Sequence, residues 1–458
     1  MAHDTRLLPV PLKTKGLVGG GVGLPQLDIS LCVPPTAAPM AAATGTSAPQ
    51  PWAGARAGLV VHVDRAQVIG AGQYATVCLG RLAAADGDGG GDAACAIKIP
   101  HEGNLDAREL GLVEAAALWQ AGSAPQTVGC YGLVDLSAGS RCTVQPWPAV
   151  AERALAGQGE WALVLEYCGG GSCWEWMSAN RPAMNTELFF VWARQLAMAL
   201  VALKAAGMAH MDIKGHNMLL GSDGSVRLAD FTATKFSGQA LAAVQLASPG
   251  FAPQKYPPYV DYGGTIPYSA PEALAPGAAA KTHTNDELHK MDIYSLGVTL
   301  YSLFVSGREP YATVKSAVEQ MLLAARGAFW GWEERHCLST LQSAAETAPS
   351  TPVDARPAAA DAARLRSPPS PPAEAATPPR HALSRSASLG QAPPARRRTL
   401  KSRKATPKEF RRFLAGDLLP PNVEALLCAM VSPDPAQRPD AADVLRTLDT
   451  IEADIFEP

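Results

Sequence analysis

The chain has 458 residues, a net charge of −3 and 47% hydrophobic residues, many of them alanine. Length alone allows about three average domains, and the near-neutral charge argues against nucleic acid as a direct partner. The nine cysteines lie singly, without a Cys-x-x-Cys pair or a histidine cluster at metal-ligand spacing. They argue against a zinc site or a disulfide framework and favour an intracellular protein, cytoplasmic or nuclear.

Residues 1–58 form a segment rich in alanine, proline and glycine. Such a composition cannot bury enough apolar surface to offset the loss of chain entropy, so we predict a disordered segment. The segment lacks a basic start followed by an apolar block and a cleavage signature. No secretory signal is therefore predicted, and organelle targeting is left as an open alternative.

Strand-like runs come next and flank a glycine-rich stretch, Ile69–Val77. A third run, Ala94–Ile99, is rich in small and branched residues and contains Lys98. The Gly/Asp-rich stretch Asp86–Asp92 before it is predicted to be a flexible hairpin connection. A lone Gly-x-Gly is usually just a hairpin, so this region indicates a function only in combination with motifs elsewhere in the chain.

The chain then changes from one helix to strands and back to helices. A helix is predicted over Leu105–Ala121 and a buried strand over Trp161–Tyr167, after which Gly169–Gly171 interrupt the pattern. The best apolar run, Leu188–Leu203, is shorter than the roughly 20 residues that span a bilayer and is interrupted by Arg194. We predict a buried amphipathic helix there and no membrane span.

The octet His210–Asn217 (His-Met-Asp-Ile-Lys-Gly-His-Asn) carries three polar side chains at spacings that phosphoryl transfer can use. Asp212 can take a hydroxyl proton, Lys214 can neutralise a phosphate, and Asn217 can hold a metal ion. Alone, the octet could equally be a turn of hydrogen-bonding side chains. Its neighbours decide between these two interpretations.

Two short strands, Met218–Leu220 and Val226–Leu228, are predicted after the octet, separated by the turn Gly221–Gly224. Asp230, the first residue of Asp230-Phe231-Thr232, comes directly after them. A second metal ligand is thereby placed beside Asn217.

The stretch from Asp230 to Glu272 contains the Pro/Tyr-rich run Pro253–Tyr262. A buried helix is predicted after it, over Met291–Val305.

A longer irregular stretch begins after Trp332, rich in Pro, Ala, Ser and Arg, and we predict a disordered insertion at about 344–405. From Arg380 to Arg412 there are eleven Lys or Arg residues against the single acid Glu409. The basic segment 396–412 could bind an acidic partner or an import receptor, and a solvated linker is an equal alternative.

In this order, and with Gly264-Thr265 and Ala270-Pro271-Glu272 added, the motifs resemble those of the eukaryotic protein kinases. Arg438, in the resumed pattern after Pro421, matches the arginine that pairs with Glu272 in that family. The resemblance implies an α+β, two-lobed fold with a small β-rich N-lobe and a larger, mostly helical C-lobe. It also implies one kinase domain over residues 59–455, interrupted by the insertion, with a monomeric core.

The family uses ATP and Mg²⁺ and acts on protein hydroxyls, and Lys214, two positions after Asp212, is typical of its serine/threonine-directed members. The resemblance makes Asp212 the catalytic base, with Lys214 and Lys98 as further catalytic residues, and makes Asn217 and Asp230 the metal ligands. The residues that it implies for ATP binding are Ile69, Gly70, Ala71, Gly72, Gln73, Tyr74, Ala75, Thr76, Val77, Lys98, Glu114, Glu166 and Cys168.

Lys98 should pair with a glutamate of the predicted helix, either Glu109 or Glu114, and counting back from Pro125 favours Glu114. Glu166, Tyr167 and Cys168 resemble the family's hinge, whose backbone pairs with adenine, and this hinge comes after a Leu165 gatekeeper.

The chain departs from the family pattern at several positions. Ala75 replaces the third glycine of the loop, where small residues are accepted. Thr232 replaces a glycine, and because a β-branched residue resists positive φ, the segment should change conformation less readily. Met211 replaces the arginine that, in the family, would receive a phosphate from the stretch Asp230–Glu272, which we call the activation segment. Ser172 and His216 stand where members that prefer basic substrates carry acids.

Two functions of different classes are consistent with these residues. One is an active serine/threonine kinase, and the other is a pseudokinase scaffold that binds ATP and partners without phosphotransfer. The presence of Lys98, Asp212, Asn217 and Asp230 favours the enzyme.

Overall fold

The structure is a computed structural model that describes residues 59–84, 93–252, 264–275, 277–278, 283–333 and 411–456. Four sequence predictions lie outside these residues: the segment 1–58, the connection Asp86–Asp92, the run Pro253–Tyr262 and the insertion at about 344–405.

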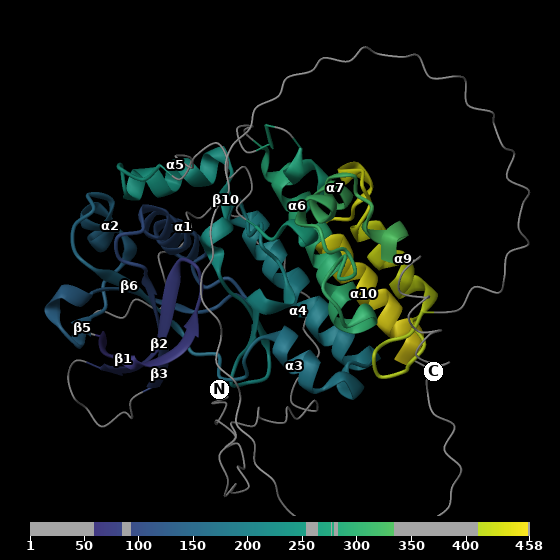
Figure 1. Cartoon of the computed structure of the whole chain (residues 1–458), viewed down its shortest axis with the longest axis horizontal. Helices are drawn as coiled ribbons and strands as arrows, with labels where there is room; N and C mark the ends of the chain where they lie inside the picture. Colours follow the sequence, from purple (N-terminus) through teal and green to yellow (C-terminus); the bar gives the residue numbers. More distant parts are fainter. Residues whose placement is uncertain are drawn as a thin grey trace, which may run out of the picture. The chain divides into compact units, whose positions relative to one another are not determined.

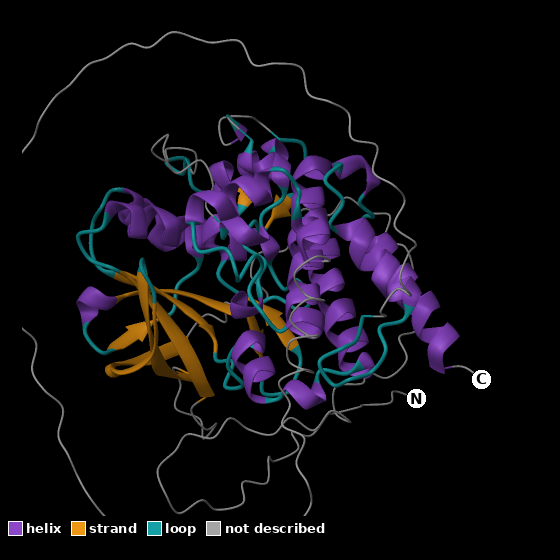
Figure 2. Cartoon of the chain, turned by 45° about the vertical axis from the view of Figure 1, so that its right-hand side comes forward, coloured by secondary structure: helices purple, strands orange, loops and turns teal. Residues whose placement is uncertain are grey.

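The N-terminal part is built on one six-stranded antiparallel sheet in the order β4-β6-β3-β2-β1-β5, drawn in orange in Figure 2. Its strands are β1 (Leu59–Ala71), β2 (Ala75–Ala84), β3 (Ala93–Pro100), β4 (Cys130–Asp135), β5 (Arg141–Thr143) and β6 (Trp161–Glu166). Because side chains alternate along a strand, Lys98 of β3 faces away from the buried Cys95 and Ile97, which belong to the core on the other face.

Two helices belong to this part, α1 (Leu105–Ala121) and α2 (Trp147–Leu155). The side chain of Asn104 caps α1 by accepting a hydrogen bond from the amide of Ala107. Helix α2 lies between β5 and β6 in sequence and contacts α1 (Figure 1). Helix α1 thus has the bounds predicted from the sequence, whereas α2 and β5 were not predicted.

The remaining elements are mainly helical. The α-helices are α3 (Cys173–Ala179), α4 (Thr186–Ala205), α5 (Gly238–Ala247), α6 (Asn285–Tyr301), α7 (Ala317–Ala325), α9 (Pro421–Met430) and α10 (Ala441–Phe456). Short strands form two small sheets, β7 (Met208–Ala209) with β10 (Lys235–Phe236), and β8 (Met218–Leu220) with β9 (Val226–Leu228). A β-rich N-terminal part followed by helices agrees with the predicted α+β class.

Helix α4 packs against α6 and α10 in the core. It is the one described helix whose length and composition would suffice to cross a bilayer, and 61% of that stretch is buried inside the protein. Helix α6 begins at Asn285, earlier than the predicted Met291, because Thr284 and Glu287 form a capping box there. The predicted end at Val305 falls in a short π-helix, Ser302–Ser306.

The basic segment predicted at 396–412 ends inside the folded part. The guanidinium of Arg411 lies 4.1 Å from the ring centre of Trp330 and 3.6 Å from a carboxylate oxygen of Glu424. Arg412 donates a hydrogen bond of 2.9 Å to the carbonyl of Gly416. Arg411 is buried and therefore cannot belong to a docking segment, which corrects the C-terminal limit of that prediction.

Candidate active site

The glycine-rich stretch forms the turn between β1 and β2. A Cβ added at Gly70 would come no closer than 3.7 Å to Val77, and one at Gly72 no closer than 3.8 Å to the carbonyl oxygen of Ala75. The hairpin's own packing therefore leaves room for a side chain at either position. Glycine instead leaves the backbone open to a close ligand.

His101, just after β3, stabilises this turn through its backbone amide and its ring. Its amide donates a 2.9 Å hydrogen bond to the carbonyl of Tyr74, and its ring Nδ1 lies 3.1 Å from the carbonyl of Gln73. A carbonyl can only accept, so Nδ1 carries a proton. Ring Nε2, 3.3 Å from Thr76 Oγ1, completes three contacts with the turn.

Lys98 joins the sheet to two other segments. Its Nζ lies 2.7 Å from Glu114 Oε2 on α1 and 2.9 Å from Asp230 Oδ1. Of the two glutamates considered from the sequence, Glu114 is therefore the partner, and Glu109 is exposed on another side of α1. The ion pairs bring together residues that are 132 positions apart in the case of Lys98 and Asp230.

The charged states of Lys98 and Asp230 stabilise each other. Burial alone would lower the pKa of Lys98, but the carboxylates of Glu114 and Asp230 outweigh it and raise that pKa well above its ordinary value. Burial alone would raise the pKa of Asp230, but Lys98 and the Thr232 hydroxyl hold it well below its usual range. The ammonium and the Asp230 carboxylate are thus both charged at neutral pH.

The backbone at Asp230 accommodates the threonine at position 232. Positive φ falls on Asp230, at 65°, whereas Thr232 lies in the 3₁₀ turn Phe231–Ala233 without positive φ. The β-branched side chain is consequently unstrained here, and its hydroxyl donates a 2.9 Å hydrogen bond to Asp230 Oδ1. Phe231 is fully buried against the ring of His210, with 4.7 Å between centroids.

The backbone of the octet His210–Asn217 is held by a buried carboxylate, that of Asp292. The amides of His210 and Met211 donate hydrogen bonds of 2.6 and 2.9 Å to the two oxygens of Asp292 on α6. Burial raises the pKa of Asp292 to about 7, although these two hydrogen bonds act in the opposite direction. Met211 adopts a positive φ of 67° in this arrangement.

The ring of His210 has a fixed proton. Its Nε2 lies 3.0 Å from the carbonyl of Ala229, and its Nδ1 accepts a 3.2 Å hydrogen bond from the amide of Asp212. A carbonyl can only accept and an amide N–H can only donate, so the ring is neutral with the proton on Nε2. Burial lowers the pKa of His210, which agrees with this state.

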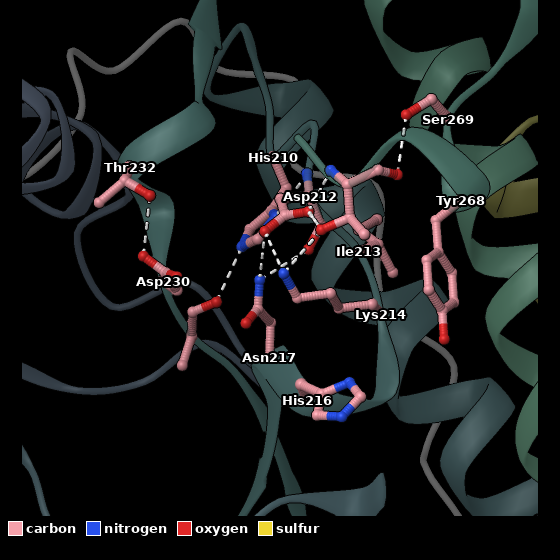
Figure 3. A network of polar contacts seen from close by, with 12 residues as sticks. His210, Asp212, Ile213, Lys214, His216, Asn217, Asp230, Thr232, Tyr268 and Ser269 are labelled. Carbon is pink, nitrogen blue, oxygen red and sulfur yellow. Dashed lines mark hydrogen bonds and ion pairs between the residues drawn. The ribbon is translucent and has the colours of Figure 1, made fainter. Parts of the chain in front are cut away.

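The Asp212 carboxylate is surrounded by four donors (Figure 3). Oδ1 accepts from the amide and the hydroxyl of Thr265 at 2.8 and 2.7 Å. Oδ2 accepts from Lys214 Nζ and Asn217 Nδ2, both at 2.8 Å. The same ammonium donates to the Thr265 hydroxyl at 2.7 Å. Asp212 is therefore held in one orientation by two residues of its own loop and one from the end of the activation segment.

The predicted hinge continues β6. The carboxylate of Glu166 contacts other residues of the chain. It lies 3.3 Å from Arg227 Nε and accepts a 3.0 Å hydrogen bond from the amide of Gly129. Its own amide donates to the carbonyl of Gly129 at 2.7 Å. None of the described residues accepts a hydrogen bond from the backbone amide of Cys168. This donor is therefore available to an adenine base.

The donor set suits a magnesium nucleotide. Asn217 donates through Nδ2, so its amide oxygen is left for a cation, and Asp230 Oδ2 has no partner among the described residues. The described part of the chain holds no group of three or more His, Cys, Asp or Glu that could bind a metal alone. Mg²⁺ prefers six oxygen ligands, so phosphate and water oxygens would have to complete the site.

The end of the activation segment is fixed by a buried ion pair. Arg438 Nη1 and Nη2 lie 2.5 and 2.9 Å from the two oxygens of Glu272, and the Arg438 side chain is 0% exposed. The pairing of these residues, 166 positions apart, agrees with the sequence prediction.

The sequence did not reveal the contacts of three functional candidates. Thr265 was noted only as part of a motif, and Asp292 only as part of a predicted helix and of a family motif, Asp292–Gly297, without its contacts. Glu309 was missed: its carboxylate accepts a 2.7 Å hydrogen bond from Tyr268 and lies 3.7 Å from His216 Nδ1. Each of these residues contacts a partner that is more than 40 positions away in the sequence. Only their proximity in the fold could identify them.

A family model described as the protein kinase domain matches residues 64–448. Similar proteins include the serine/threonine-protein kinase ppk11 of Schizosaccharomyces pombe, 34% identical over 152 residues, which are 33% of this chain and 41% of that protein. Aurora kinase of Encephalitozoon cuniculi is 26% identical over 32% of this chain and 45% of its own length. The human non-receptor tyrosine-protein kinase TNK1 is 30% identical over 33% of this chain and 20% of its own length.

The chain thus spans less than half the length of each of these relatives, and they include kinases of both hydroxyl classes. The family model, in contrast, runs from β1 to α10 and covers both halves of the candidate site. This chain belongs to the protein kinase family.

Proposed function

We propose that this protein is an active kinase that transfers the γ-phosphoryl group of ATP to serine or threonine hydroxyls of proteins. The observation that carries the proposal is the position of Asp212, whose two carboxylate oxygens are held by Thr265, Lys214 and Asn217. Phosphoryl transfer depends mainly on positioning and charge stabilisation, and this arrangement supplies both.

In the proposed reaction, the acceptor hydroxyl donates its hydrogen bond to Asp212 Oδ2 and displaces the ammonium of Lys214. Asp212 takes the proton of the hydroxyl as the hydroxyl oxygen attacks the γ-phosphorus of ATP, and the bond from that phosphorus to the β–γ bridging oxygen breaks, so that ADP leaves. Lys214, released from the carboxylate, neutralises charge on the transferred phosphoryl group. Thr265 keeps its two hydrogen bonds to Oδ1 throughout, so the orientation of the base is preserved.

Protein kinases use ATP with Mg²⁺, which offsets the charge of the triphosphate and orients it. Asn217 and Asp230 would hold the metal ion through their available oxygens. Lys98 would contact the phosphates while Glu114 keeps its ammonium in place. The turn between β1 and β2 would cover the phosphates with backbone amides.

The test is phosphotransfer by the purified protein. With labelled Mg·ATP and generic protein acceptors, we expect labelled phosphoserine or phosphothreonine after acid hydrolysis of the products. Protein carrying Asp212→Asn, purified in parallel, controls for contaminating kinases. Binding of ATP without any labelled product would instead support the pseudokinase scaffold, and labelled phosphotyrosine alone would contradict the proposed acceptor class.

Phosphatase treatment should leave most of this activity intact. The octet has Met211 where a guanidinium would receive an activation-segment phosphate, and Met211 is buried. Burial also lowers the pKa of Lys235, another basic residue of the segment, and so acts against its charged form. The measurement compares initial rates before and after treatment. A loss of more than about tenfold, equivalent to about 1.4 kcal/mol in the barrier, would refute the prediction.

A peptide library should show no dominant arginine upstream of the phosphorylated residue. Ser172, which stands where other members carry an acid, bears no charge, and its hydroxyl caps α3 and donates a 2.9 Å hydrogen bond to Glu175. Glu309, the carboxylate beside His216, is already bound by the hydroxyl of Tyr268. Strong selection for arginine three residues before the phosphosite would overturn this expectation, and the variant Glu309→Gln would then show whether Glu309 is responsible.

We also propose an intracellular location. It is supported by the free thiols of all seven cysteines in the described part of the chain. Fractionation of cells expressing the full-length protein would test it. Recovery from the secreted fraction would contradict it.

A further inference from the structure

Helix α1, which carries Glu114, is covered on all sides in its central part. Every residue from Gly111 to Leu118 is buried. A helix that packs through one face alone leaves about half of each turn exposed to solvent, so more than two fully buried turns require neighbours on opposite sides.

The sheet covers one side of α1. At Gly111, an added Cβ would lie 2.9 Å from both Pro100 of β3 and Trp161 of β6, so the helix approaches the sheet as closely as glycine allows. Helices α2 and α5 cover the other side, where Figure 1 shows α5 lying across α1 and α2. Helix α5 belongs to the activation segment, so part of that segment packs against the helix that bears Glu114.

An aromatic contact joins the activation segment to α2. The rings of Trp147, at the start of α2, and Phe251, just after α5, are 5.7 Å apart and nearly perpendicular. Both side chains are buried, at 0% and 2% exposure. The side-chain amide of Gln245 on α5 donates a 3.1 Å hydrogen bond to the carbonyl of Phe251, which ties the backbone of Phe251 to the helix.

In sequence, Phe251 lies between the two points at which the activation segment contributes to the site. The activation segment carries Asp230 before α5 and Thr265 after it, and both contact the catalytic lysines, Lys98 and Lys214. On its other side, α2 packs on α1 and therefore on the helix that places Glu114 against Lys98. A shift of the segment away from α2 would loosen α1 and the Lys98–Glu114 ion pair together.

We propose that Trp147 and Phe251 are positioning residues. Their contact holds the activation segment against α1 and thereby keeps Glu114 paired with Lys98 without a phosphate or a second protein. The catalytic consequence rests on the proposed phosphotransfer function, whereas the structural consequence does not. A contact within the chain replaces the ordering that Met211 cannot provide through a phosphate.

The test compares Phe251→Ala with Phe413→Ala in the full-length protein. Phe413 is equally buried, at 2% exposure, but packs against Phe189 in the C-terminal part. We expect Phe251→Ala to lower kcat at least tenfold and to speed amide hydrogen exchange at least tenfold in residues 105–121. Phe413→Ala should lose stability to a similar degree, yet keep kcat within threefold and the exchange of α1 unchanged.

A conservative pair completes the design. Trp147→Phe keeps an aromatic ring against Phe251 and should retain kcat within threefold, whereas Trp147→Ala should behave like Phe251→Ala. Equal losses of kcat in Phe251→Ala and Phe413→Ala, or unchanged exchange of α1 in Phe251→Ala, would overturn the proposal. If the wild-type protein transfers no phosphate, the proposed function fails, but the exchange of α1 still decides this inference.

Discussion

Asp212→Asn should lower phosphotransfer about a thousandfold, because the amide cannot take the proton of the acceptor hydroxyl. Asparagine nearly matches aspartate in shape, but its NH₂ must face either the Thr265 amide or the donors Lys214 and Asn217. One former acceptor position then opposes a donor, so we also expect a loss of about 1–3 kcal/mol in stability. The measurements are kcat/KM and the free energy of unfolding.

The control is Asp449→Asn, the same chemical change on α10. The Asp449 side chain is 65% exposed and pairs with Arg194 far from the site. It should retain full activity, since an exposed ion pair contributes at most about 1 kcal/mol. Turnover of the Asp212 variant at the wild-type rate would remove Asp212 from the role of base.

Lys98→Met should abolish measurable turnover and also destabilise the protein. The substitution removes the counter-charge from Glu114, whose side chain is 1% exposed, and from Asp230. Loss of one partner from a buried ion pair costs about 3–5 kcal/mol, because an uncompensated charge stays in the interior. The sequence predicts the pairing of Lys98 with Glu114, and the burial of Glu114 adds a structural role for Lys98 to its proposed catalytic one.

The double variant Lys98→Met/Glu114→Gln separates the two roles. It should regain much of the lost stability, because no buried charge is left at position 114, while turnover stays absent. Recovery of activity in the double variant, or full stability in the single variant, would contradict this account of the ion pair.

The pH dependence of the single variant gives a further check. Burial raises the pKa of Glu114 even beside Lys98. A carboxyl whose pKa is raised by folding binds its proton more tightly in the folded state, so its contribution to stability is present at low pH and is lost as pH rises through the folded pKa. The thermal midpoint of Lys98→Met should therefore rise as pH is lowered from 8 towards 5, and the double variant should show little of this rise.

Local signals explain which elements were predictable. The strands β8 and β9 flank a turn with glycine at both ends, and α1 begins at the capping residue Asn104. These signals lie within a few residues of the elements that they limit, so the predicted bounds agree with the structure. The order of motifs likewise predicts that Lys98, Asp212, Asn217 and Asp230 belong to one site, and the fold brings Lys98 to Asp230 and Asn217 to Asp212.

Contacts between distant segments explain what was missed. Helix α5 has ten residues and is largely alanine and other small or apolar residues, so its sequence lacks a clear polar face. Helix α2 buries Trp147, Val150, Ala151 and Ala154 at helical spacing, but with nine residues it is too short for this pattern to be distinctive. Both helices are stabilised by partners such as Trp147 and Phe251, which are over 100 positions apart. The positive φ of Asp230 was likewise not predicted, because the Lys98 ion pair and the buried Phe231 hold this backbone through distant contacts.

The stacking of Arg411 on Trp330 has a consequence for how this protein can change. The structure describes the chain up to Glu333 and again from Arg411. The stacking of Arg411 on Trp330 shows that these two positions lie close together. Joining ends that are already together costs only about 0.6 kcal/mol more for each doubling of the connecting length. The connection could therefore lengthen, accept a foreign domain or provide new termini in a circularly permuted chain while the site keeps its geometry. Evolution can alter these residues and the catalytic residues independently.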